Sequence, residues 1–268
     1  EIINAIEKIT NSNIKFSVVE PRVGDPAMLI AEIQRAKEEL NWIPKNDLNS
    51  IILSSWEWQN YVQVQMIFLD EFKNKIDPIL EKKERRLANT YIEKDDVVLE
   101  LGARYGTVSC TINNILSNKL NQVSVEPDER VWEALEQNKK NNNSSFRIIK
   151  GFISNKKLSL YNKDTYYGGY GATSRYDEES NIPIYTIKDI EYEYNLTFNT
   201  LVADCEGCLE RFFSENRYFV SKLRLIIFEA DRPNICDYSY VRNMLKDYNF
   251  NEVENGHQNV WIKTNKIK

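Results

Sequence analysis

Short apolar runs alternate with segments of helical periodicity along the C-terminal part of the chain. One run, Val97–Leu101, leads into Thr107–Leu116, where apolar residues recur at helical spacing. Further runs of strand character follow at Gln122–Glu126, Phe146–Lys150, Thr200–Ala203 and Leu225–Phe228. Strands that alternate with helices predict an α/β fold with a mostly parallel sheet and right-handed crossovers.

A final pair of strands is expected at Asn249–Val253 and Asn259–Lys263, joined around Asn255-Gly256. This hairpin would add an antiparallel terminal strand to the parallel sheet. That arrangement is typical of Rossmann-like class I methyltransferases rather than of NAD-binding domains. We therefore expect residues 91–268 to form one domain of that fold class.

The N-terminal part has a different pattern, with little strand character. We expect a small α-rich unit over residues 1–60 that buries little surface by itself and leans on a neighbour. Residues 61–90 are expected to form a helical connector, and the mixed charge run Glu81–Arg86 to be a solvated helix face. The helices and strand expected in the first unit are Ile2–Thr10, Ile14–Glu20, Glu32–Leu40 and Leu48–Asn60.

Composition narrows the class of protein. The chain has 268 residues with a net charge of −5, and no basic run is interleaved with aromatic residues, so a nucleic-acid partner is disfavoured. No apolar stretch is long enough for a membrane span and no signal peptide opens the sequence, which predicts a cytoplasmic location without a membrane partner. Because Glu1 stands inside an expected helix, we expect a larger parent polypeptide or an epimerase-like neighbour.

The cysteines are expected to be reduced thiols, because they fall within regular elements of a long chain. Cys205-x-x-Cys208 has the spacing of a redox or metal motif, but no second pair and no cluster of histidines accompanies it. We interpret the pair as two small residues beside the end of a strand. The four cysteines are Cys110, Cys205, Cys208 and Cys236.

The loop after the first strand of this domain carries a candidate cofactor site. Gly102 and Gly106 would let the backbone approach a ligand closely, and the helix that follows would aim free N–H groups at it. The spacing is not that of a dinucleotide fingerprint, and no P-loop Lys-Ser/Thr is present. With Glu100 before the first glycine, the loop favours S-adenosylmethionine over NAD or ATP, and Tyr105 would favour its sulfonium.

Acidic residues follow several of the predicted strands. The carboxyl ends of parallel strands share one edge of a sheet, so these residues should converge there. Glu126 would accept hydrogen bonds from ribose hydroxyls, Phe152 or Ile153 would flank adenine, and Asp204 is also expected to contact the cofactor. The residues considered for deprotonating an acceptor hydroxyl are Asp204, Glu206, Glu229 and, in the terminal hairpin, His257. Asp204, Glu206 and Glu229 would alternatively bind a divalent cation, and the sequence leaves both mechanisms open.

Several of these motifs, taken in order, resemble the FkbM family of S-adenosylmethionine-dependent O-methyltransferases. They are Glu100-Leu101-Gly102-Ala103-Arg104-Tyr105-Gly106, Glu126-Pro127, Asp204-Cys205-Glu206-Gly207-Cys208-Leu209-Glu210 and Ile226-Ile227-Phe228-Glu229. The resemblance implies that Ala103 and Pro127 join the cofactor contacts, and that the substrate is a sugar or glycan hydroxyl. The sequence departs from the family in its Glu100, where Asp is commoner, and in the extra Leu209 before Glu210.

A second resemblance covers residues 1–60. The runs Glu20-Pro21-Arg22-Val23-Gly24-Asp25-Pro26-Ala27 and Trp56-Glu57-Trp58-Gln59 are similar to the C-terminal tail of UDP-glucose 4-epimerases. In that family the matching arginine and aspartate, here Arg22 and Asp25, contact a nucleotide sugar. The catalytic half of such an epimerase is not in this sequence, so the resemblance implies no epimerase reaction.

Both resemblances point to carbohydrate. The first hypothesis is an O-methyltransferase that moves a methyl group from S-adenosylmethionine to a sugar hydroxyl. The alternative is a non-catalytic module that binds a sugar nucleotide or a partner enzyme. The tyrosine- and glycine-rich segment 166–171 would close over a sugar, or else be disordered or serve only in packing.

Overall fold

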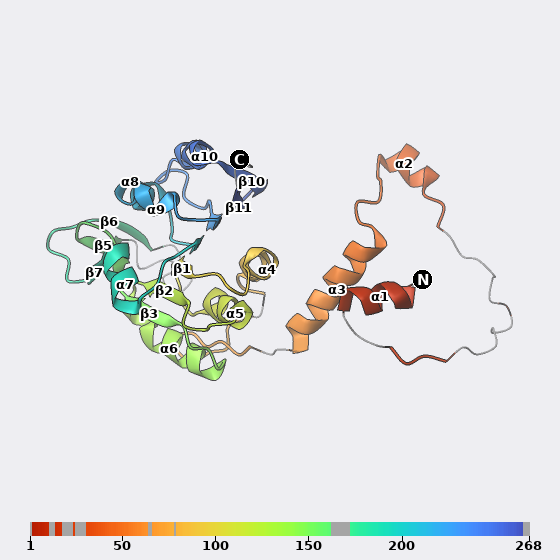
Figure 1. Cartoon of the computed structure of the whole chain (residues 1–268), viewed down its shortest axis with the longest axis horizontal. Coiled ribbons are helices and arrows are strands. Elements are labelled where there is room, and N and C mark those ends of the chain that lie inside the picture. The colour runs from red at the N-terminus through yellow and green to blue at the C-terminus, as the bar shows by residue number, and fades with distance from the viewer. Residues whose placement is uncertain are drawn as a thin grey trace. The chain divides into compact units, whose positions relative to one another are not determined.

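The computed structural model describes residues 2–10, 14–17, 24, 31–63, 66–77, 79–161 and 172–264, with the backbone alone over 57–63. It divides the chain into two compact units, Glu1–Gln65 and Met66–Lys268 (Figure 1). The expectations for Arg22, Asp25 and residues 166–171 lie outside the described residues. None of the described helices is both long enough and apolar enough to cross a membrane.

The first unit is helical where it is described. Its helices are α1 (Ile2–Thr10), α2 (Gln34–Leu40) and α3 (Leu48–Gln63), and α1 packs against α3. No side chain of α1 or α2 is buried, while Leu40, Trp42 and Trp56 are exposed. Residues 14–17, the described part of the expected strand Ile14–Glu20, form no strand.

The second unit is built on a seven-stranded sheet in the described part of the chain, with the order β10-β11-β9-β8-β1-β2-β3. The strands β1, β2, β3, β8 and β9 run parallel, whereas β11 is antiparallel to β9 and to β10. This is a Rossmann-like α/β fold, as predicted. The strand bounds are Val98–Leu101, Gln122–Glu126, Arg147–Lys150, Thr200–Ala203, Leu225–Glu229, Phe250–Glu254 and Gln258–Lys263 for β1, β2, β3, β8, β9, β10 and β11.

Helices cover both faces of the sheet. On one face, α4 (Lys82–Tyr91) and α5 (Thr107–Ile115) pack on Val98, Val202 and Ile227. On the other face, α7 (Ile187–Tyr194), α8 (Leu209–Glu215), α9 (Arg217–Val220) and α10 (Tyr238–Asp247) enclose a core with Leu99 and Leu101. The helix α6 (Trp132–Asn141), preceded by the short 3₁₀ helix η1 (Glu129–Val131), packs against α5 through Leu135 and Cys110.

Two separate two-stranded sheets follow β3. After β3, the strand β4 (Phe152–Ile153) pairs with β7 (Ile184–Tyr185). Between them, β5 (Leu158–Tyr161) and β6 (Thr173–Tyr176) form an antiparallel pair that the sequence pattern did not reveal.

The interval expected to be a connector belongs to the second unit from Met66 onward. Helix α4 begins only at Lys82, and before it Phe68 is buried against Leu135 and Phe146. The expectation that Glu81–Arg86 forms a solvated face is wrong for Arg85, which is only 3% exposed and donates to the carbonyl oxygen of Leu80, whereas Lys82, Lys83 and Arg86 are exposed.

Candidate functional site

A cavity lies at the carboxyl ends of β1, β2 and β8 and encloses about 880 Å³, counting its opening to solvent. Its walls combine the strand ends with the hairpin β5–β6 and with α8. The residues that line it are Glu81, Leu101, Gly102, Arg104, Val125, Glu126, Pro127, Asp128, Gly151, Phe152, Ile153, Leu160, Ala172, Ser174, Asp204, Cys205, Glu206, Cys208, Arg211 and Phe212.

The glycines of the loop after β1 have separate roles. Gly102 has a φ of +86°, and a Cβ atom there would lie 1.7 Å from the carbonyl oxygen of Asp204, so only glycine lets the two strand ends approach. Gly106, with a φ of +79°, precedes α5, and its missing Cβ makes room for Leu135 of α6. Gly102 lines the cavity as predicted, whereas Gly106 instead sets the packing of two helices.

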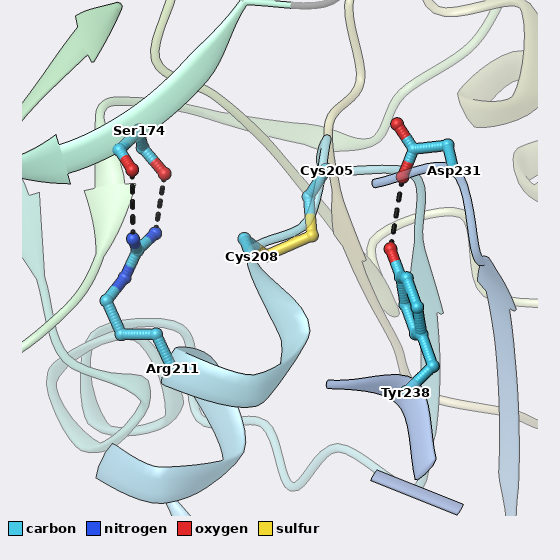
Figure 2. The surroundings of a disulfide bond; sticks show 6 residues. All are labelled: Ser174, Cys205, Cys208, Arg211, Asp231 and Tyr238. Atoms are coloured by element: carbon cyan, nitrogen blue, oxygen red, sulfur yellow. Dashed lines mark hydrogen bonds between the residues drawn. A yellow bond between two sulfur atoms is a disulfide. The ribbon is translucent and has the colours of Figure 1, made fainter. Parts of the chain in front are cut away.

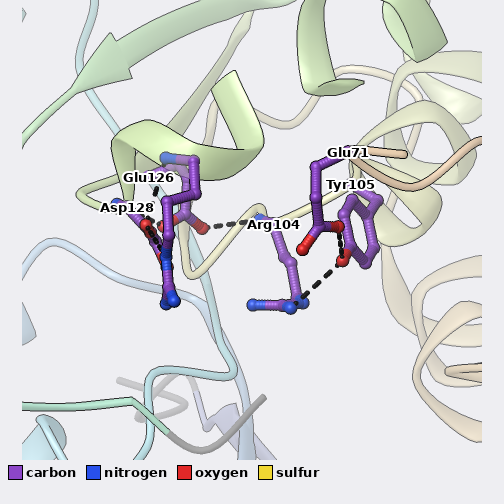
Figure 3. A network of polar contacts seen from close by, with 6 residues as sticks. Glu71, Arg104, Tyr105, Glu126 and Asp128 are labelled. Carbon is purple, nitrogen blue, oxygen red and sulfur yellow. Dashed lines mark hydrogen bonds and ion pairs between the residues drawn. The ribbon is translucent and has the colours of Figure 1, made fainter. Parts of the chain in front are cut away.

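Backbone N–H groups from two segments hold the carboxylate of Glu126 (Figure 3). Oε2 accepts from the N–H of Arg104 at 2.7 Å, and Oε1 accepts from the N–H of Asp128 at 2.8 Å. Each carboxylate oxygen keeps a further lone pair for a ligand hydroxyl. Burial raises the pKa of Glu126 to about 7, against the opposing effect of these two hydrogen bonds. The predicted cofactor residue is therefore present in the cavity and already oriented.

Three other predicted cofactor residues, Glu100, Ala103 and Tyr105, do not line the cavity. The side chain of Glu100 is on the α5 face of the sheet, where it accepts from Ser124 at 2.5 Å, and burial raises its pKa to about 7. Tyr105 is only 4% exposed and donates to the carboxylate of Glu71 (Figure 3). Ala103 is also buried, against Cys110 and Leu135. Glu100, Ala103 and Tyr105 are therefore not part of the cavity lining, and their expected contact with the cofactor stays a prediction.

The apolar part of the cavity comes from the segment after β3. Phe152 and Ile153 line it together with Leu160 from β5. Gly151 precedes them and approaches the carbonyl oxygen of Pro183, to which Phe152 donates its N–H at 2.9 Å. The structure thus places Phe152 where it was expected, with β4 fixed by its pairing to β7.

The acidic loop after β8 brings two predicted residues into the cavity. Burial and a hydrogen bond shared with Glu229 raise the pKa of Asp204 well above its ordinary value. Burial and the neighbouring Asp231 raise the pKa of Glu206 to about 7, although Nε of Arg232 lies 2.6 Å from its Oε2. A carboxyl group with a pKa near 7, such as that of Glu206, is suited to accept a proton near neutral pH.

Glu229 and His257 do not line the cavity, but they lie behind Asp204. Nε2 of His257 is 2.6 Å from Oε1 of Glu229, and Nε2 of Gln258 donates to the same oxygen at 2.9 Å. The imidazole is 58% exposed, whereas the Glu229 side chain is 15% exposed. The two residues therefore link Asp204 to solvent instead of contacting a ligand in the cavity directly.

Cys205 and Cys208 form a disulfide on the cavity wall, so the expectation of reduced thiols is wrong for this pair (Figure 2). The bond closes the turn in which Glu206 and Gly207 both have positive φ, at 52° and 83°. The two cysteines were correctly placed beside a strand end, but their side chains converge because this turn reverses the chain before α8. Cys110 and Cys236 are free and buried.

Several cavity residues were not foreseen from the sequence. Glu81 precedes α4 and accepts a hydrogen bond from Thr107, and burial together with the charges of Glu84 and Glu100 raises its pKa to about 8. Arg211 reaches the cavity from α8. Neither residue follows a strand, so the rule that located the other residues does not apply to them.

The suggested cation site is not formed in the part of the chain that the structure describes. There, no three side chains among His, Cys, Asp and Glu gather in a way that would hold a metal ion. Asp204 instead shares a hydrogen bond with Glu229, Glu229 contacts His257, and Glu206 pairs with Arg232.

Comparison with known proteins gives two kinds of similarity. No family model matches the sequence. UDP-glucose 4-epimerases are locally similar, with 36% identity over 58 residues for the protein of Rhizobium leguminosarum bv. trifolii and 39% over 59 residues for that of Lacticaseibacillus casei. Each match covers 22% of this chain and 18% of the epimerase, so the chain spans under a fifth of these relatives. The expected local resemblance to epimerases is confirmed.

Solved structures similar to the chain include several methyltransferases. The ribosomal protein L11 methylase of Lactobacillus delbrueckii subsp. bulgaricus has 12% identity and a TM-score of 0.40, with 68% of this chain and 78% of that one covered. The precorrin-6y C5,15-methyltransferase of Geobacter metallireducens GS-15 has 12% identity and a TM-score of 0.43, with 66% of this chain and 85% of that one covered. Aeropyrum pernix fibrillarin with bound S-adenosyl-L-methionine has 14% identity and a TM-score of 0.39, with 68% of this chain and 73% of that one covered.

Proposed function

We propose that the second unit transfers a methyl group from S-adenosylmethionine to a hydroxyl group of a sugar or glycan. The observation that carries the proposal is that one cavity is lined both by Glu126, whose carboxylate is held by backbone N–H groups, and by Asp204 and Glu206. The first residue suits a ribose, and the other two suit a hydroxyl acceptor.

The residues present fit S-adenosylmethionine. Gly102 leaves the loop after β1 without a side chain at the cavity, and Glu126 offers lone pairs to two ribose hydroxyls. Phe152 and Ile153 provide an apolar surface for adenine. The carboxyl groups nearby favour a positively charged ligand. When bound, this cofactor supplies a methyl group that is activated by its sulfonium charge.

Asp204 is the leading candidate for the general base. An alcohol is not ionised at neutral pH, so its proton must be taken up as the methyl group is transferred. Asp204 lines the cavity and shares a hydrogen bond with Glu229, which in turn contacts His257. A proton accepted by Asp204 can therefore pass toward an exposed imidazole. Glu206 is the second candidate, although Arg232 neutralises it in part.

Two features support a carbohydrate acceptor. The motifs from Glu100 to Glu229 resemble FkbM-family O-methyltransferases, and a local segment is similar to UDP-glucose 4-epimerases. The epimerase-like segment also links the chain to sugar nucleotides, although it spans only 18% of those enzymes.

Calorimetry of the full chain with S-adenosylmethionine and with NAD tests the choice of cofactor. We expect S-adenosylmethionine to bind and NAD not to bind. Glu126→Gln should weaken S-adenosylmethionine at least about tenfold, because it removes a charged acceptor of two hydroxyls. Glu129→Gln is the matched control, since Glu129 is exposed and close in sequence. Binding of NAD alone contradicts the proposal.

Transfer of labelled methyl groups to a panel of sugars and sugar nucleotides tests the reaction. Cofactor binding without transfer to any hydroxyl would favour the alternative hypothesis, a non-catalytic sugar-nucleotide or partner-binding module.

A further inference from the structure

Arg211 crosses from α8 to the hairpin β5–β6 at the wall of the cavity (Figure 2). Its Nη2 donates to Oγ of Ser174 at 2.6 Å, and its Nη1 donates to the carbonyl oxygen of Ser174 at 3.3 Å. Both residues line the cavity. Two contacts to one residue fix the plane of the guanidinium, so its orientation does not depend on a ligand.

No carboxylate of the described residues forms an ion pair with Arg211. The nearest candidate on its own helix is Glu215, which instead accepts from Oη of Tyr176 at 2.8 Å and from Oγ of Ser154 at 3.0 Å. Of the five N–H groups that a guanidinium carries, two donate to Ser174, and the others find no acceptor among the residues that the structure describes.

This arrangement leaves a positive charge that is costly by itself. Burial lowers the pKa of Arg211, and Tyr176 and Glu215 offset this only in part. The guanidinium is half-buried and lies 5.9 Å from the centre of the Tyr176 ring, which offers no acceptor in line with its remaining N–H groups. An anionic group in the cavity would supply the missing partner.

The charges of the cavity are divided between two sides. Glu126, Asp128, Asp204 and Glu206 come from the strand ends, whereas Arg211 stands on the wall formed by α8 and β6. Arg104, the other lining arginine, lies over the ring of Tyr105 at 4.6 Å and donates to its hydroxyl (Figure 3). A ligand that reaches Arg211 therefore meets a cationic wall, and one at the strand ends meets an acidic one.

We propose that Arg211, positioned by Ser174, binds an anionic group of the methyl acceptor, so that the substrate is a sugar bearing a phosphate or a carboxylate. The proposal rests on the proposed function and narrows its substrate class. Gly102 follows β1 and Glu126 ends β2, whereas Arg211 belongs to α8 and Ser174 to β6. A planar fork with free N–H groups suits a phosphate or carboxylate, which accepts two parallel hydrogen bonds.

Calorimetry of the full chain with three probes tests this assignment. Glucose 1-phosphate and glucuronate carry the two anionic groups, and methyl glucoside is neutral. We expect at least one anionic probe to bind more tightly than methyl glucoside, and Arg211→Gln to weaken it about 10- to 100-fold, the range of hydrogen bonds to charged groups. Whichever anionic probe binds identifies the group as phosphate or carboxylate.

Arg175→Gln is the matched control. Arg175 neighbours Ser174 on β6 but is exposed, with its guanidinium over the ring of Tyr161 at 4.5 Å, and it does not line the cavity. The same charge is removed at nearly the same place, so the affinity for the anionic probe should stay within about twofold. Arg211→Lys keeps the charge and loses the fork, and we expect it to recover part of the affinity.

Ser174 is tested as a positioning residue. Ser174→Ala should lower the affinity for the anionic probe. Ser174→Thr should retain that affinity, because threonine keeps the hydroxyl acceptor. Thermal unfolding of each variant shows whether it is folded.

Three outcomes would overturn the assignment. They are equal affinity of folded Arg211→Gln and the unaltered protein for the anionic probes, no preference over methyl glucoside, and loss of S-adenosylmethionine binding in Arg211→Gln. The last result would show that Arg211 contacts S-adenosylmethionine and not the methyl acceptor. Failure of the unaltered protein to bind S-adenosylmethionine overturns the proposed function separately, since binding of anionic probes is measured without the cofactor.

Discussion

The carbonyl oxygen of Asp204 occupies the space in which a Cβ atom of Gly102 would lie, only 1.7 Å from its ideal position. The loops after β1 and β8 are thus in direct backbone contact at the floor of the cavity. Gly102→Ala must separate them and also hold alanine at a φ of +86°. We expect the free energy of unfolding to fall by about 2–4 kcal/mol, from strain and overpacking together, as measured by chemical denaturation.

Gly256→Ala separates the two causes of that loss. Gly256 also has a positive φ, at +152°, but its Cβ would meet no atom closer than 4.0 Å. Gly256→Ala should therefore lower the free energy of unfolding by less than Gly102→Ala does. Equal losses in the two variants would show that the contact with Asp204 is unimportant.

The binding of S-adenosylmethionine should depend on pH through Glu126. Burial raises the pKa of this residue to about 7, and ribose hydroxyls donate to its ionised form. The affinity should therefore rise with pH through 7 and level off above pH 8. The expected change between pH 6 and pH 8 is about tenfold for one such group.

Calorimetry across this range measures the effect. In Glu126→Gln the dependence should be smaller, and what is left reports on Glu206, whose pKa is also about 7. An affinity that decreases from pH 6 to pH 8 would contradict the assignment of Glu126 to a ribose.

Asp204→Asn should separate chemistry from binding. The amide keeps the shape of the side chain but cannot take up a proton, so the rate of methyl transfer should fall about 10²- to 10⁴-fold. S-adenosylmethionine should still bind, because Glu126 and Phe152 are unchanged. Asp95→Asn removes an exposed carboxylate before β1 and serves as the control. An Asp204→Asn variant with full activity would transfer the role of base to Glu206.

Most of the sheet could be predicted because its strands are buried on both faces and read as continuous apolar runs. The bounds predicted for β2 and β8 agree with the structure, and the final hairpin was marked by Asn255-Gly256. The acids at or soon after the ends of strands, Glu126, Asp204 and Glu206, were located because parallel strands end at one edge.

The sequence was less informative where side-chain direction decides the outcome. Leu99 and Leu101 pack on one face of β1, so Glu100 between them must point to the other face, toward α5. The alternation of side chains in a strand could have predicted this direction of Glu100. The resemblance of its motif to a methyltransferase loop suggested a cofactor contact instead. Glu81 precedes α4 and Arg211 lies within α8, so neither follows a strand directly, and no local pattern marks them.

The disulfide predicts a definite number of reactive thiols. Alkylation of the unfolded chain without reductant should label Cys110 and Cys236 only, and prior reduction should add Cys205 and Cys208, as counted by mass spectrometry. Because the bond closes a loop of only four residues, its chain-entropy contribution is small, about 2 kcal/mol. Reductant should therefore lower the stability of the unaltered protein by up to about this amount. The Cys205→Ser/Cys208→Ser variant should not respond to reductant, and labelling of all four cysteines before reduction would show that the bond is not formed in solution.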